Sequence, residues 1–178
     1  MKITMLPSEK GDCLLIEAGG VAILADGGMP ASYEAAVRPF LAKWAAAGNA
    51  LDLVYVSHVD QDHIGGVLQM LEDIVLWRVH KHKLATGKPT NKPKFGEPPV
   101  VNRIWHNAFK ALVEDNTGEI ATMLASRANS LTSSTNLAAL KLAAAYRNIA
   151  NSIPEAIKVS RRIATDQLNI PLNGEFAK

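Results

Sequence analysis

Residues 57–66 read Ser57-His58-Val59-Asp60-Gln61-Asp62-His63-Ile64-Gly65-Gly66 and place four side chains of metal-ligand type within six positions. In an extended segment, residues two apart point the same way, so His58, Asp60 and Asp62 are expected to converge while His63 turns toward a second position beside them. A polar turn that caps a helix needs one carboxylate, not four ligand-type side chains. The motif therefore predicts a site for one or two divalent metal ions.

The segments around this motif predict a mixed α/β fold. A nearly continuous apolar run over 51–57 indicates a buried strand before the motif, and 67–71 indicates a short helix after it. Upstream, the apolar runs 14–18 and 21–25 flank Gly19-Gly20 and predict a β-hairpin. The second of these strands ends in Asp26-Gly27-Gly28, which places a carboxylate at a strand end.

A helix is expected over 33–47, with Ser32 as its N-cap, and it implies a parallel crossover to the strand at 51–57. Further strands are expected at 74–79 and 100–105, separated by a long exposed loop over 80–99. Beyond residue 106 the composition is helical, and helices are expected over 108–114, 119–129, 134–151 and 154–167. We expect these helices to form an antiparallel layer, which divides the chain into a β/α part (1–106) and a helical region (107–178).

The motif at 57–66 resembles the first metal motif of metallo-β-lactamase-fold hydrolases, and Asp26-Gly27-Gly28 resembles the early aspartate-glycine strand end of that family. The resemblance covers roughly the first hundred residues. It implies the N-terminal part of an αββα sandwich followed by a helical region. It also implies a metal-dependent hydrolase in which His58, Asp60, Asp62 and His63 bind the metal and Asp62 is catalytic.

The commonest form of the family motif has histidine where this chain has Asp60, and the variant is similar to the C-terminal domain of the natural-competence DNA channel. A carboxylate ligand shifts the metal preference toward manganese, magnesium or iron, although zinc is still accepted, so zinc or manganese is expected. The resemblance favours a phosphodiester substrate over a lactam.

Further ligands are implied downstream by the same resemblance, and His106, which follows a predicted strand, is the best additional candidate. Asp26 is expected either to orient a metal ligand through a hydrogen bond or to serve as a turn residue that satisfies backbone amides. Because the remaining family ligands are not recognisable, the alternative is a truncated, non-catalytic member that acts through protein interaction. A second chain or an oligomer that completes the fold is a third interpretation.

Composition sets limits on partners and compartment. The net charge of +2 is too small to drive nucleic-acid binding, although a basic segment over 78–94 leaves a nucleic-acid partner open beside a small-molecule or phosphodiester substrate. Cys13 is the only cysteine, and we expect it to be a small packed residue. No disulfide, leader sequence or membrane span is expected, and a cytoplasmic location follows as the default.

Overall fold

The computed structural model describes residues 1–106 and 117–173, and its centre is a five-stranded sheet in the order β1-β2-β3-β4-β5. Strands β1 (Lys2–Met5), β2 (Leu14–Ala18) and β3 (Val21–Ala25) are antiparallel neighbours. Strands β4 (Leu53–Val56) and β5 (Ile104–His106) then continue the sheet in parallel with β3. The mixed α/β class predicted from the sequence is confirmed.

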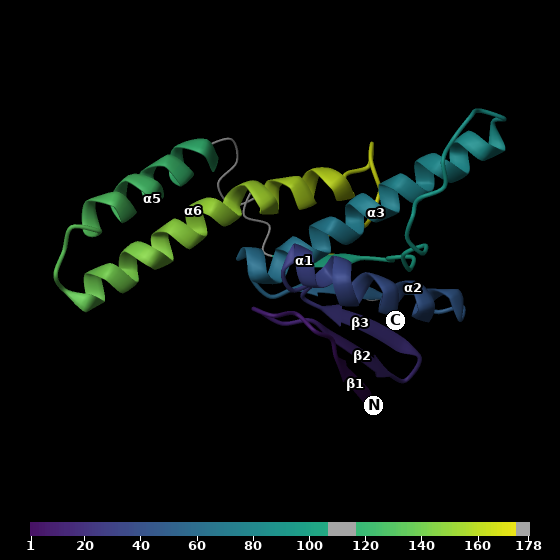
Figure 1. Cartoon of the computed structure of the whole chain (residues 1–178), viewed down its shortest axis with the longest axis horizontal. Coiled ribbons are helices and arrows are strands. Elements are labelled where there is room, and N and C mark those ends of the chain that lie inside the picture. The colour runs from purple at the N-terminus through teal and green to yellow at the C-terminus, as the bar shows by residue number, and fades with distance from the viewer. Residues whose placement is uncertain (107–116, 174–178) are drawn as a thin grey trace.

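Helices lie on one side of this sheet (Figure 1). The first helical stretch comprises α1 (Pro30–Ser32), a π-helical turn η1 (Tyr33–Val37) and α2 (Arg38–Ala46). The long helix α3 (Gln61–Ala85) follows β4, and the chain later forms α5 (Thr117–Leu131) and α6 (Leu137–Ile163). Helix α6 packs on α3, while α5 pairs with α6 in a hairpin that extends beyond the sheet (Figure 1). None of the helices in the described ranges is both long and apolar enough to cross a membrane.

The hydrophobic core fills the space between the sheet and these helices. Alternate positions of the central strands form the sheet side of the core. Leu15, Leu24, Val54 and Ile104 are almost fully buried there, in one row across the sheet. The helices supply the rest, and their buried members include Val37, Leu41, Ile64, Val67, Met70, Leu71, Ile153, Val159 and Ile163. The sheet therefore uses one face for the main core.

The opposite positions of the same strands form a second apolar face, here called the open sheet face. Strand alternation and the register assign eleven residues to it, all apolar or aromatic: Ile3, Met5, Leu14, Ile16, Ala18, Val21, Ile23, Ala25, Leu53, Tyr55 and Trp105. Several are well exposed, including Met5 at 80%, Ile3 at 53% and Tyr55 at 42%.

The predicted hairpin and crossover are both confirmed. Gly19 and Gly20 have φ values of 57° and 79°, the left-handed conformations that a two-residue turn between twisted strands requires. The first helix, however, begins at Pro30, so Ser32 lies inside it and caps nothing. The widened η1 turn ends just before Pro39, which lacks an amide hydrogen and cannot continue a regular α-helical ladder.

The strand predicted at 74–79 is wrong, because these residues continue α3 to Ala85. Buried positions at Ile64, Val67, Met70, Ile74 and Trp77 recur at helical spacing along the core. The β-branched residues suggested a strand, but burial on one helical face outweighs that local preference. The predicted loop over 80–99 is wrong in its first six residues for the same reason, and β5 covers only the end of the strand predicted at 100–105.

The break predicted before Pro154 is also wrong. Helix α6 runs through Pro154 without interruption, although proline inside a helix costs about 3 kcal/mol relative to alanine. Ile153, Ala156, Val159 and Ile163 are all buried on either side of it, and this packing offsets the lost hydrogen bond. The helix expected at 119–129 is confirmed as part of α5, whereas the one expected at 108–114 lies outside the described residues.

Candidate metal centre

The motif forms the connection between β4 and α3. Asp60 has extended backbone angles and Gln61 begins the helix, so Asp62 and His63 belong to the first turn of α3 instead of the extended segment that the spacing suggested. Val59 is buried against the core, which directs its neighbours outward. The side chains of His58 and Asp60 are accordingly 50% and 33% exposed.

Backbone contacts hold this connection against the end of β3. The amide of Gly27 donates to the carbonyl of His63 over 2.8 Å, and the amide of Gly66 donates to the carbonyl of Gly28 over 2.9 Å. A Cβ atom on Gly66 would lie 1.9 Å from the Gly27 carbonyl oxygen. Gly66 is therefore required for the close approach of α3 to the end of β3, which brings Asp26 to His63.

Asp26 is the buried centre of the resulting hydrogen-bond network. Its Oδ1 accepts from the Ser57 amide (2.8 Å), while Oδ2 accepts from the Ser57 hydroxyl (2.7 Å) and lies 3.0 Å from His63 Nδ1. Asp26 adopts a φ of 57°, a left-handed conformation that aspartate tolerates better than most residues and that aims its carboxylate toward β4. Its amide still donates to the Tyr55 carbonyl and so extends the ladder between β3 and β4.

This network determines which nitrogen of each imidazole carries hydrogen. A carboxylate only accepts, so the hydrogen between Asp26 and His63 sits on His63 Nδ1. The Ser57 hydroxyl gives its one hydrogen to Asp26 and can only accept from His58 Nδ1, which lies 2.9 Å away. Both histidines then present the lone pair of Nε2, the atom available to a metal ion.

Each free Nε2 faces a carboxylate of the motif. His58 Nε2 is 3.8 Å from Asp60 Oδ2, and His63 Nε2 is 4.0 Å from Asp62 Oδ1. These separations are too long for hydrogen bonds but match an ion bound to both atoms at about 2.0–2.2 Å each. The two rings lie 3.7 Å apart between centroids. His58, Asp60 and Asp62 are nevertheless not members of the group of three ligand-type side chains found in the described residues, whose ligand atoms lie within 4.8 Å of one another.

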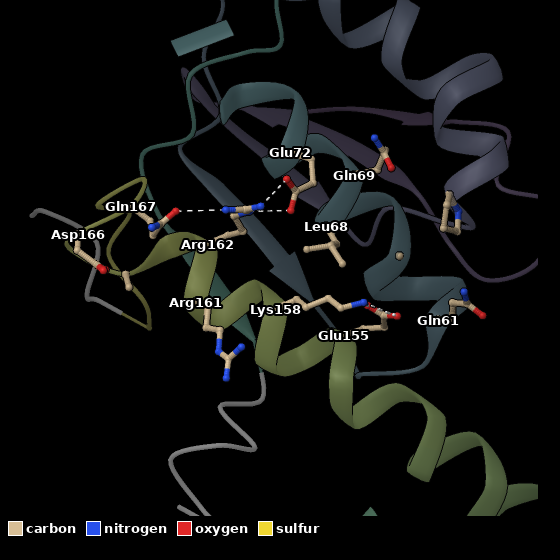
Figure 2. A pocket seen from close by; sticks show the side chains of 13 residues that line it. Gln61, Leu68, Gln69, Glu72, Glu155, Lys158, Arg161, Arg162, Asp166 and Gln167 are labelled. Carbon is tan, nitrogen blue, oxygen red and sulfur yellow. Dashed lines mark hydrogen bonds and ion pairs between the residues drawn. The ribbon is translucent and has the colours of Figure 1, made fainter. Parts of the chain in front are cut away.

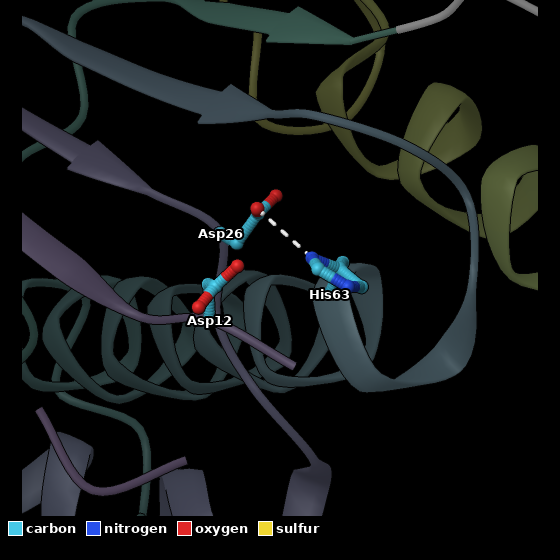
Figure 3. Close-up of side chains that lie close together, drawn as sticks. All are labelled: Asp12, Asp26 and His63. Atoms are coloured by element: carbon cyan, nitrogen blue, oxygen red, sulfur yellow. Dashed lines mark hydrogen bonds and ion pairs between the residues drawn. The ribbon is translucent and has the colours of Figure 1, made fainter. Parts of the chain in front are cut away.

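Asp12, which has no signal in the sequence, also approaches this centre (Figure 3). One ligand atom from each of Asp12, Asp26 and His63 lies within 4.8 Å of the other two, an arrangement that could hold a metal ion. Asp12 precedes β2 and is exposed, whereas Asp26 is buried and already accepts the hydrogen bonds described above. Asp26 therefore suits the orienting role better than a ligand role, while Asp12 remains free to contribute an oxygen.

The other predicted site residue, His106, lies at the end of β5 opposite Val56 and is buried. Its Nε2 is 3.5 Å from the Ser160 hydroxyl of α6, on the helix-covered face of the sheet. It is not in the cluster with Asp12, Asp26 and His63, and its role as a ligand stays a prediction. Burial, with the nearby Asp26 charge, raises the pKa of the Cys13 thiol to about 12, which fits an unreactive packed residue.

A cavity of about 780 Å³ lies between α3 and α6 and meets the motif at Gln61 and Gly65 (Figure 2). Its lining carries as many acidic as basic side chains: Arg162 donates to Glu72 through two nitrogens, Lys158 contacts Glu155, and Arg161 and Asp166 add one charge of each sign. The balanced charge gives the cavity no preference for an anionic ligand.

Much of the basic segment over 78–94 is also engaged. Lys81 pairs with Glu97, Arg78 donates to the Leu168 carbonyl, and Lys92 lies over the Trp77 ring. These contacts tie the segment to its own fold and leave fewer of its cations for a polyanion.

Asp26→Asn is expected to weaken metal binding by about 10- to 100-fold, because the amide removes the charge that holds His63 by Nδ1. Isothermal titration calorimetry with zinc or manganese measures the change in the metal dissociation constant. Asp52→Asn is the matched control, since Asp52 accepts the Ala22 amide at the other end of β3, away from the motif. Equal affinities in the Asp26→Asn variant and the wild type would contradict the orienting role.

Comparison with known proteins agrees with this geometry. Neither the curated proteins nor the solved structures compared with this chain gave a significant match. A family profile described as the Metallo-beta-lactamase superfamily matches residues 8–123, which is more than half of the chain and extends past β5 into α5. The match includes the strand end at Asp26 and the whole motif, and most members of this superfamily are metal-dependent hydrolases. The chain therefore belongs to the metallo-β-lactamase superfamily.

Proposed function

We propose that this protein is a metal-dependent hydrolase whose metal is held by His58, Asp60, Asp62 and His63. The observation that carries the proposal is the single buried carboxylate of Asp26, which orients His63 directly and His58 through Ser57. Such second-layer contacts set the hydrogen position of metal-binding histidines. A histidine pair used only for packing would not need both Nε2 atoms directed at carboxylates.

We propose that the four side chains hold one divalent ion or an adjacent pair, since His58 lies near Asp60 and His63 lies near Asp62. When bound, the metal supplies the acidification of water that produces a nucleophile near neutral pH. Asp26 and Ser57 hold the two imidazoles by Nδ1 and leave Nε2 outward, and Asp60 and Asp62 add the negative charge that attracts a cation. The exposure of His58 and Asp60 leaves the centre open to a substrate.

Two imidazole nitrogens and two carboxylates make a mixed donor set, for which we propose zinc or manganese. Oxygen donors favour manganese more than an all-histidine set does, whereas imidazole suits zinc. Asp12, close to Asp26 and His63, would add a further oxygen and strengthen the preference for manganese.

For the substrate we propose a phosphodiester. Support comes from the carboxylate at position 60 and its similarity to the corresponding domain of the competence DNA channel. The charge contacts of the 78–94 segment argue against a long nucleic-acid track, so a small phosphodiester fits better than a polymer.

The test compares wild-type protein with Asp62→Ala by elemental analysis and by hydrolysis of bis(p-nitrophenyl) phosphate with zinc, manganese or magnesium. We expect near-stoichiometric metal in the wild type, and loss of both metal and hydrolysis in Asp62→Ala. Asp52→Asn, which removes a carboxylate elsewhere, should keep both.

Asp12→Asn distinguishes a metal held by the motif residues from a metal held by Asp12, Asp26 and His63. If Asp12 is only a neighbour of the centre, its replacement leaves the metal content unchanged, whereas loss equal to that of Asp62→Ala would move the centre to Asp12, Asp26 and His63. Wild-type protein that binds no metal and hydrolyses nothing would instead identify a non-catalytic member of the superfamily.

A further inference from the structure

The last turns of α3 and the segment 86–99 that follows the helix line a cavity of about 440 Å³. The segment turns back along α3 (Figure 1), and its Thr90 hydroxyl lies 3.2 Å from Nδ1 of His80. The volume falls within the range of small-molecule sites, which is roughly 300–1,000 Å³. Along α3, at about 1.5 Å per residue, the cavity is roughly 20–30 Å from the motif, so it is separate from the metal centre.

The described residues that line this cavity include basic side chains but no acidic one. Four of them are polar and the others form apolar walls: His80, Lys83, Thr90 and Asn91, then Leu76, Val79, Pro89, Pro93 and Phe95. Leu76, His80 and Lys83 are three or four positions apart, so they share one face of α3. The cavity between α3 and α6 has acidic and basic side chains in equal number, whereas the charge of this one favours an anion.

Two side chains of the lining are available to hold an anion. His80 is only 8% exposed, and its Nε2 has no hydrogen-bond partner in the part of the chain that the structure describes. The Thr90 hydroxyl can donate to Nδ1, which leaves the hydrogen of a neutral imidazole on Nε2, as a donor to a ligand. Lys83 pairs with no carboxylate of the described residues, whereas Lys81 on another face of the helix pairs with Glu97. An anion in the cavity would therefore complete the hydrogen bonding of a buried ring and neutralise an unpaired ammonium.

We propose that this cavity binds a small monocarboxylate whose body is apolar and about the size of one or two rings. The Lys83 ammonium and the His80 Nε2 hydrogen match the single charge and the two oxygens of a carboxylate. The apolar walls, with Phe95 among them, remove the body of the ligand from water. A polyanion fits less well, because three neighbouring cations of the 78–94 segment are engaged within the fold. The proposal does not depend on metal binding or on hydrolysis.

Isothermal titration calorimetry of the full chain with 2-naphthoate, in buffer with a chelator, tests the proposal. We expect saturable binding of one molecule per chain, and at least about 10-fold weaker binding of the neutral 2-naphthamide. Lys83→Met should weaken the binding of 2-naphthoate by about 10- to 100-fold, because it removes the charge-assisted hydrogen bond to the carboxylate. The matched control is Lys88→Met, which removes the same charge from an exposed lysine that does not line the cavity and should leave the binding unchanged.

Val79→Trp is a second variant that keeps every charge in place. Val79 is 46% exposed, so a larger ring there fills part of the cavity without entering the core, and 2-naphthoate binding should be lost. Far-UV circular dichroism checks that both variants are folded. A wild type that does not bind 2-naphthoate, or binds it no more tightly than 2-naphthamide or 2-naphthyl phosphate, overturns the proposal. So does a folded Lys83→Met variant with wild-type affinity, because Lys83 would then only complement the negative end of the helix dipole.

Discussion

Gly66→Ala is expected to lower the free energy of unfolding by at least about 3 kcal/mol, because overpacking at rigid backbone cannot relax by side-chain movement. The new Cβ would lie 1.9 Å from the Gly27 carbonyl oxygen and 2.6 Å from its carbon. The end of β3 would have to separate from α3, which breaks the hydrogen bonds from Gly66 to Gly28 and from Gly27 to His63. Urea denaturation followed by circular dichroism measures the loss.

Gly118→Ala is the control for this substitution. Gly118 lies in the first turn of α5, and no atom in the part of the chain that the structure describes comes within 4 Å of a Cβ built there. Alanine should leave the stability unchanged or raise it by up to about 1 kcal/mol, since glycine is the poorer helix former. If Gly66→Ala and Gly118→Ala had the same stability, the close contact between β3 and α3 would be disproved.

Arg38→Met is expected to cost about 3–5 kcal/mol of stability, because it leaves the carboxylate of Asp73 buried without its counter-charge. The Asp73 side chain is only 1% exposed, and Arg38 donates to it through Nε (2.7 Å) and Nη2 (3.1 Å). Desolvation opposes the charged guanidinium, but the hydrogen bond and the charge of Asp73 outweigh it and raise the pKa of Arg38. Arg38 therefore stays charged, and thermal unfolding at neutral pH measures the loss.

The matched comparison for Arg38→Met is a variant in which Tyr33, Arg38 and Asp73 are all replaced by apolar residues. Tyr33 also donates to Asp73, so the triple variant Tyr33→Phe, Arg38→Met, Asp73→Leu leaves no polar atom of this group unpaired. We expect it to recover most of the stability lost in Arg38→Met, as buried ion pairs replaced by apolar residues usually do. Glu34→Gln should cost less than about 1 kcal/mol, since Glu34 is half exposed and 3.6 Å from Arg38. A single Arg38→Met variant as stable as the wild type would contradict the requirement for charge compensation at Asp73.

The structure also explains which predictions from sequence failed. The strand predicted at 74–79 and the break predicted at Pro154 both relied on local preferences of β-branched residues and proline. In the fold, one face of α3 and one face of α6 pack against each other over the sheet. Burial along these helices exceeds the local cost, and no short window of sequence contains that information.

The metal centre was only partly accessible from sequence. The motif at 57–66 identified four ligand-type residues because they are adjacent in the chain, and adjacency needs no knowledge of the fold. Asp12 and Ser57 carried no signal, since Asp12 comes from a loop 50 positions before Asp62 and the hydroxyl of Ser57 acquires its role only next to Asp26.

By itself the sequence determined the hairpin, the parallel crossover, the α/β class and the metal motif, because glycine pairs, short apolar runs and clustered ligands act over a few residues. Only the tertiary structure decided the length of α3 and α6, the hydrogen positions on His58 and His63, and the exposure of one apolar face of the sheet. Each of these depends on which distant segments pack together, and the burial and hydrogen bonding that result do not exist until the chain has folded.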